Sequence, residues 1–136
     1  MVAPSTQQAW LVSVSGIPGY WQTKSGGEKS SETTKDYDGG SLEPEVIASP
    51  AEIDNITVSR SYKASRDLEA LRMASSKVGR WRTTVSVTPT DEDLMANGQP
   101  RTYPNALLVR CTEPEVDRSS GDPATWELEF AVAVVV

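Results

Sequence analysis

Alternation of apolar and polar residues is the main pattern of this chain, and it predicts β-strands. In residues 81–87, Trp81, Val85 and Val87 alternate with Arg82 and Ser86, which is typical of a strand with one buried face. Similar stretches recur along the chain. The predicted strands are residues 9–14, 17–23, 42–48, 53–62, 81–87, 103–112 and 125–136.

Two of these strands carry additional signals. Pro44 restricts residues 42–48 to a sheet edge or a strand entry, because proline cannot donate to a ladder, and Ser49-Pro50 is expected to break the strand. Residues 125–136 place Trp126 and Phe130 on one face, and their last third is apolar on both faces. We therefore expect that last strand to be central and covered on both sides.

One helix is predicted over residues 66–78. Ser65 is a suitable N-cap and Gly79 a suitable stop, so the element extends over about 65–78. Apolar residues at spacings of three and four form a single narrow stripe, which predicts packing on a sheet by one side. The stripe consists of Leu68, Leu71, Ala74 and Val78.

A long polar arm, over about 24–41, separates the second and third predicted strands. It has no aliphatic residue before Leu42 and its only aromatic residue is Tyr37. Most connections in compact domains have about 4–6 residues, so the arm either contacts a partner outside its domain or is a mobile surface loop without a role. Its charges alternate in sign, at Glu28, Lys29, Glu32, Lys35, Asp36 and Asp38.

These elements predict the fold class. About seven strands and one helix indicate a mainly β protein, an antiparallel two-sheet β-sandwich or open barrel with one flanking helix. With 136 residues, the chain fits a single domain over 1–136 from which the arm protrudes.

The composition excludes several kinds of chemistry. The chain has no histidine, which removes the commonest general base and metal ligand, and its lone cysteine, Cys111, is expected in the core. The acidic pair Glu127/Glu129 is explained by a solvated strand face. Basic residues such as Arg60 could contact phosphate, although a solvated face or interface ion pairs explain them better. We expect no catalytic residues, no metal and no cofactor.

Charge and hydropathy limit the binding partners and the cellular location that we expect. A net charge of −6 opposes nonspecific binding to a polyphosphate. No run approaches the roughly 20 apolar residues that span a bilayer, and the first ten residues lack the features of a signal peptide. We expect a cytosolic product without membrane anchoring.

The ordered series of motifs resembles bacteriophage major tail tube proteins. It covers nearly the whole chain, from Trp10 to Val134, and the series carries the resemblance rather than any single residue. The segments are GGE, DYDGGSLEPEVI, ITVSRSYKASRD, GRWRTTVSVTPT, YPNALLVRCTEPEVD and WELEFAVAV.

The resemblance implies a structural virion protein that forms hexameric rings, which stack into the tube for DNA ejection. It implies partners in the tape measure protein, the tail terminator and the baseplate or tip proteins, with assembly in the host bacterial cytoplasm and DNA passing without specific binding. The family's arm reaches toward neighbouring subunits and the next ring. Here it corresponds to Lys24, Glu28, Lys29, Glu32, Lys35, Asp36, Tyr37 and Asp38.

The bore of such a tube is expected to be acidic or neutral, because a basic lining would hold DNA at every ring. Glu127 and Glu129 are the candidates for lining it. Six subunits that each lend four strands give a wall roughly 48 Å across, from strands about 4.8 Å apart and tilted by about 40°.

Two other functions stay open. The first is the tube or ring of a contractile injection or secretion device, which differs in cargo and carries a sheath; between the two, the flexible phage tail is the first expectation. The second is a carbohydrate-binding β-sandwich, which needs an exposed aromatic cluster. Its candidates are Trp10, Tyr20, Trp21, Trp81 and Trp126.

Overall fold

The computed structural model describes residues 10–36, 39–40, 43, 45–91, 93, 95 and 98–136. These residues form a mainly β fold with one helix, α1 (Ala64–Ser76). The strands are β1 (Trp10–Val14), β2 (Thr23–Gly26), β3 (Lys29–Asp36), β4 (Glu45–Ile53), β5 (Ile56–Ser61), β6 (Arg82–Pro89), β7 (Arg101–Thr112) and β8 (Thr125–Ala131).

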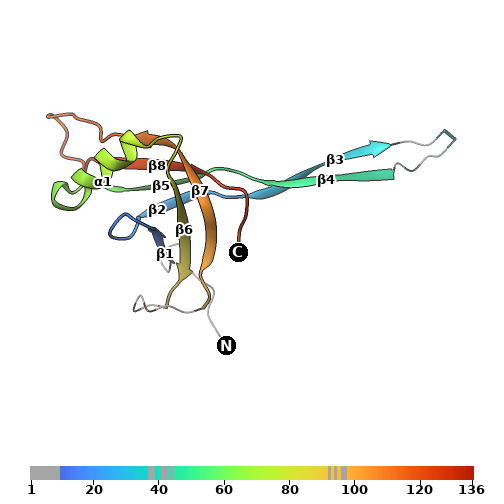
Figure 1. Ribbon diagram of the computed structural model, residues 1–136, viewed down its shortest axis with the longest axis horizontal. Helices are drawn as coiled ribbons and strands as arrows, with labels where there is room; N and C mark the ends of the chain where they lie inside the picture. Colours follow the sequence, from blue (N-terminus) through green and yellow to red (C-terminus); the bar gives the residue numbers. More distant parts are fainter. Residues whose placement is uncertain are drawn as a thin grey trace.

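Six strands form one antiparallel sheet in the order β1-β6-β7-β8-β5-β2. The sheet curls into a half-barrel, and an isolated bridge joins Val12 of the edge strand β1 to Trp21, which lies just before the other edge strand, β2. The remaining strands, β3 and β4, pair only with each other and project away from this body as a hairpin (Figure 1). The predicted class, an open antiparallel barrel with a flanking helix and an arm, is confirmed.

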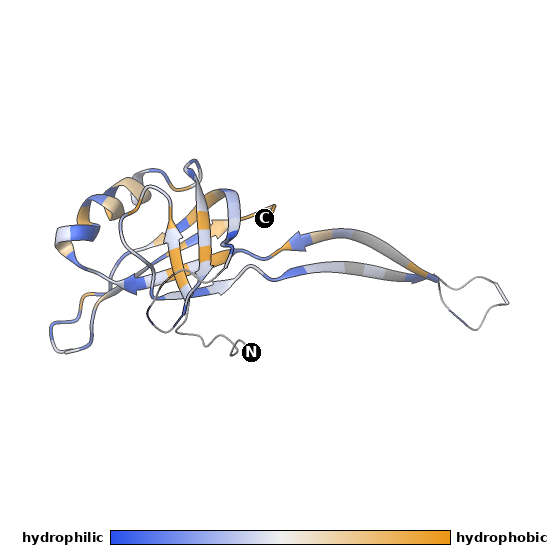
Figure 2. Ribbon diagram, turned by 90° about the horizontal axis from the view of Figure 1, so that it is seen from below, coloured by the Kyte–Doolittle hydropathy of each residue, from blue (hydrophilic) through white to orange (hydrophobic). Residues whose placement is uncertain are grey.

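The inner face of the curled sheet holds the core. Trp126, Leu128 and Phe130 alternate along β8 and are fully buried, as their spacing predicts. They pack with the inward residues of the neighbouring strands, and the hydrophobic segments concentrate in the strands of the body (Figure 2). Because each strand contributes every second residue to this face, the alternate residues form the opposite face, which is mostly polar but includes half-buried Leu11 and Leu107.

Three strand predictions need correction. Residues 17–22 are irregular, and only Trp21 bridges to β1 before β2 begins at Thr23. β4 continues through Ser49-Pro50, because a register shift opposite Ser31 and Thr33 accommodates the extra residue there. β8 ends at Ala131, and the segment after it lies beside β7 instead, where Val136 and Thr102 exchange two backbone hydrogen bonds.

The helix is confirmed, but its ends and its buried face differ from the prediction. It begins two residues earlier, with Lys63 rather than Ser65 at the N-cap and without a side-chain capping bond. Ala70 and Ala74 are buried, whereas Leu68 and Val78 are 40% and 42% exposed. The buried positions at spacings of three and four therefore begin at Asp67, a charged residue that the apolar stripe omitted.

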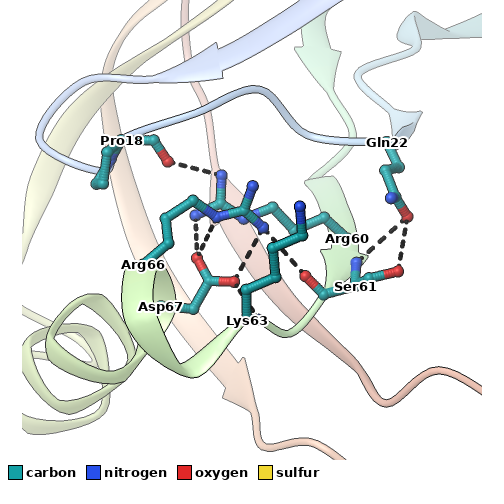
Figure 3. A network of polar contacts seen from close by, with 7 residues as sticks. All are labelled: Pro18, Gln22, Arg60, Ser61, Lys63, Arg66 and Asp67. Carbon is teal, nitrogen blue, oxygen red and sulfur yellow. Dashed lines mark hydrogen bonds and ion pairs between the residues drawn. The ribbon is translucent and has the colours of Figure 1, made fainter.

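Asp67 is buried because it pairs with Arg60 on the inner face of β5. Their closest nitrogen and oxygen atoms lie 2.5 Å apart, and Arg60 also donates to the carbonyl of Pro18 at 2.7 Å. Asp67 accepts further bonds from Arg66 and from the Lys63 amide (Figure 3). The guanidinium of Arg60 lies 4.4 Å from the ring centroid of Trp21. This network ties the helix to the sheet.

Hydrogen bonds lower the pKa of Asp67 despite its burial. Burial alone raises the pKa of this carboxyl, but the bonds from Arg66 and Lys63 and the charges of the two guanidiniums outweigh it. The carboxylate is therefore ionised at neutral pH.

No helix in the described part of the chain is long and apolar enough to cross a membrane.

Candidate assembly surfaces

The hairpin of β3 and β4, called here the ribbon, is exposed along its length. Each of its residues with a described side chain is exposed, except Ile53, which is half-buried. Nine residues of strand reach roughly 30 Å, and Figure 1 shows the ribbon extending from one end of the body. An isolated two-stranded hairpin is at best marginally stable in water, so the ribbon lacks the packing that would hold it alone.

The base of the ribbon is built into the body. Gly26 ends β2 with a φ of 82°, and a Cβ there would lie 2.0 Å from the carbonyl oxygen of Asn55. Beyond it, the Asp54 amide donates to the Glu28 carbonyl at 2.9 Å. Only glycine permits this close crossing, which directs the chain out of the half-barrel and back.

The predicted arm residues do not all lie on the ribbon. Lys24 belongs to β2 inside the main sheet, where its ammonium lies 5.5 Å from the ring centroid of Tyr103. Glu28 is at the ribbon's base. The positions on β3 are Lys29, Glu32, Lys35 and Asp36, whereas Tyr37 and Asp38 lie outside the described residues.

The register of the ribbon separates its charges onto two faces. Residues directly opposite each other in an antiparallel pair share a face, and alternate residues change face. One face, called the lysine face, holds Lys29 and Lys35 with apolar partners from β4. Its cross-strand pairs are Lys29 with Ile53, Ser31 with Ala51, Thr33 with Ala48 and Lys35 with Val46.

The alternate positions form the acidic face of the ribbon. There Ser30 is opposite Glu52, and Asp36 is opposite Glu45. Glu32 occupies a β3 position of the same alternation. The charges that alternate in sign along the sequence thus lie on two different faces of the ribbon. This separation can be recognised only once the pairing with β4 is known.

Glu127 and Glu129 lie on the outer, polar face of the main sheet, opposite the core. Glu129 pairs with Arg110 at 3.1 Å and accepts a hydrogen bond from Asn55 at 3.2 Å. The neighbouring outward positions include Ser59 and Thr112, the register partners of Glu127 on either side. This face therefore presents a hydroxyl-rich and partly acidic surface over β2, β5, β8 and β7.

α1 and the loop of residues 113–124 lie at the end of the body opposite the ribbon (Figure 1). A groove of about 490 Å³, called here the end groove, lies between them. Its apolar walls include Leu71 of the helix and Val116, whose side chain is 88% exposed. Its charged lining consists of four acidic residues, Glu113, Glu115, Asp117 and Asp122, and one basic residue, Arg118.

A second groove, of about 590 Å³, lies at the opening of the half-barrel and is lined by Trp10, Lys24 and Tyr103 among others. Three aromatic residues line it, Trp10, Trp21 and Tyr103, but Trp21 and Tyr103 are buried, so it lacks the exposed aromatic cluster that a carbohydrate site requires. Trp21 and Trp126 are buried in the core with ring centroids 4.9 Å apart. The remaining candidate, Trp81, is partly buried against the core, so only Trp10 and Tyr20 are exposed.

Reactive groups are sparse. The described residues contain no group of three Cys, Asp or Glu side chains placed to hold a metal ion. Burial raises the pKa of the Cys111 thiol, and the nearby Glu113 raises it further. The thiol is therefore protonated at neutral pH, which opposes a role as a nucleophile. That the chain is not an enzyme stays a prediction.

No protein-family model matches this chain, and no curated protein matches its sequence. The fold itself is shared with chains of solved particle structures. A chain of the cryo-EM structure of the anti-feeding prophage cap, described as the AFP tube terminating cap, matches with a TM-score of 0.83. The two chains are 16% identical over 100% of this chain and 91% of that chain.

Two further matches come from an extracellular contractile injection system, PVC, in the extended state. A chain of its sheath/tube terminator structure has a TM-score of 0.81 and 20% identity, covering 99% of this chain and 96% of that chain. A chain of its sheath-tube complex has a TM-score of 0.77 and 20% identity, covering 98% and 90%. At these identities the matches establish the fold. They agree with the tail tube resemblance, without favouring a flexible phage tail.

Proposed function

We propose that this chain is the tube subunit of a contractile injection device, which closes into hexameric rings that stack into a hollow tube. The main support is the full-length match to chains of PVC and AFP particles, together with a ribbon that has no packing partner of its own in the described chain. The contractile form, rather than the DNA-ejecting flexible tail first expected, is favoured because these matches include a sheath-tube complex.

The outer face of the sheet supports the ring. Four neighbouring strands, β7, β8, β5 and β2, carry its hydroxyl-rich surface. Six copies of four strands close a wall roughly 48 Å across. In this arrangement Glu127 and Glu129 line the bore, and a cargo passes without strong binding because the lining is polar and not basic.

Assembly would require partners at each stage. The proposed tube ends on a terminator and begins on a baseplate, both of which occur in the particles whose chains match this fold. A tape measure protein would set its length, and a sheath around the tube would distinguish the contractile device from a flexible tail. No catalytic step is part of this proposal.

The experiment is assembly of the purified protein. We expect soluble protein at low concentration and tubes in negative-stain micrographs after concentration. A deletion variant, in which Asn-Gly replaces residues 29–53, should keep a folded body and lose tubes, because the bonded Glu28 and Asp54 can be joined by a two-residue turn.

Circular dichroism and thermal unfolding serve as the control that the deletion variant is folded. Strictly monomeric wild-type protein at every concentration would contradict the proposed function. Normal tubes from the deletion variant would show that the ribbon is dispensable for stacking.

A further inference from the structure

We infer that the lysine face of the ribbon docks into the end groove of a second copy in the adjacent ring. This inference rests on the proposed function and adds to it the two surfaces that join consecutive rings. The ribbon lies at one end of the molecule, and α1 and the loop of residues 113–124, which line the groove, lie at the other (Figure 1). In a head-to-tail stack the two ends of successive copies meet, which is the geometry of a heterologous interface that extends without closing.

The end groove offers acidic and apolar contacts together. Among the described residues, Glu113, Glu115 and Asp122 form no ion pair, although they line the groove. Val116 presents an almost fully exposed apolar side chain beside them. Arg118 is the one cation of the lining, against four carboxylates, so the groove is acidic on balance. A ligand that matches it must supply positive charge and apolar surface along the same edge.

The lysine face supplies that combination. Lys29 and Lys35 are exposed, and the β4 residues that share their face include Val46, which is 60% exposed, and Ile53. The apolar side chains can pack on Val116 and Leu71 while the two ammonium groups meet the carboxylates. Burying the apolar face in this way gives the ribbon the packing that a lone hairpin lacks.

The acidic face of the ribbon fixes the orientation of docking. If the ribbon turned over, Glu45 and Glu52 would face the acidic groove, and like charges at close range are unfavourable. The same side of the ribbon is thus selected in every copy. The acidic face is left toward solvent or the bore.

Reciprocal charge reversal tests this contact. A ribbon variant, Lys29→Glu with Lys35→Glu, and a groove variant, Glu113→Lys with Glu115→Lys, should each form rings but at least tenfold less pelletable tube than wild type. Combining all four substitutions in one chain should restore tubes, because every ribbon again meets a groove of opposite charge. An equimolar mixture of the two variants should also form tubes, in which their rings alternate.

The matched control is Glu45→Lys with Glu52→Lys, which reverses two charges on the other face of the same ribbon and should still stack. Tubes from both single-surface variants at wild-type yield would overturn the docking contact while leaving the tube function intact. Failure of the four-substitution chain and of the mixture to restore tubes would also overturn it. Absence of tubes from the wild-type protein would instead reject the proposed function.

Discussion

Asp67 holds the helix on the half-barrel through charge rather than through apolar contact. It is fully buried, and its carboxylate receives bonds from two guanidiniums and from a backbone amide. Removal of one member of such a pair leaves the other charge buried and uncompensated, which is costly. Replacing the Asp67 carboxylate by a neutral group should therefore weaken the docking of α1 on the half-barrel.

Asp67→Asn should lower the free energy of unfolding by about 3–5 kcal/mol at neutral pH, because Arg60 stays buried without its counter-charge. The pKa of Asp67 in the folded chain lies below its ordinary value of 3.8. Its contribution is therefore complete above about pH 4 and is lost as the pH falls through the folded pKa. The difference between variant and wild type should shrink in acid.

Urea unfolding at a series of pH values measures this difference. The control is Glu69→Gln on the same helix, since Glu69 is 88% exposed and its distance from Arg72 is 3.9 Å. That variant should differ little from wild type at any pH. An unfolding free energy of Asp67→Asn equal to that of the control would refute the role assigned to the buried pair.

The ribbon is an element whose exit from the body depends on backbone conformation. Gly26 combines a positive φ with a close approach to the Asn55 carbonyl, so a side chain meets both strain and overlap. Gly79, after the helix, also has a positive φ, of 85°, but a Cβ there meets no atom within 4 Å. Substitutions at the two glycines therefore distinguish the cost of a left-handed backbone from the cost of steric overlap.

Gly79→Ala should cost about 1 kcal/mol of unfolding free energy, the strain of a left-handed residue. Gly26→Ala should cost clearly more, because the β2–β5 crossing must also move apart. Chemical unfolding of the two variants measures both costs, with assembly assays on each. Equal destabilisation of the two would show that the crossing at Asn55 relaxes without cost.

At the scale of the whole molecule, the fold places the helix and the polar outer face on opposite sides of the main sheet. α1 packs on the inner face through Asp67 and Arg60, whereas Glu127 lies on the outer face. If the outer face lines the bore, as proposed, the exposed surface of the helix lies on the outside of the tube. The two sides then differ in access to large reagents.

Glu127→Cys in a Cys111→Ser background should react with a small maleimide in assembled tubes but not with a maleimide on a polymer wider than the bore. Glu69→Cys in the same background is the control, and it should react with both. Reaction of position 127 with the large reagent in intact tubes would place that residue outside and refute the assignment of the bore.

The sequence predicts those features of the fold that depend on residues close together in the chain. The alternation of Trp126, Leu128 and Phe130 predicts their burial because a strand has a period of two. It does not predict the buried Arg60, whose partner is on the helix, or the continuity of β4 past Pro50, which depends on the register with β3. The two faces of the ribbon and the end groove likewise require pairings between distant segments.

If rings stack through the ribbon and the end groove as proposed, a finished stack has two chemically unlike termini, because the two surfaces lie at opposite ends of the subunit. One terminal ring displays vacant acidic clefts, and the opposite one displays unsatisfied cationic strands. A protein that closes the first must offer a lysine-bearing strand, whereas a protein that nucleates or seals the second must offer an acidic cleft. In that case the polarity of the stack is determined by the subunit itself, before any other component joins.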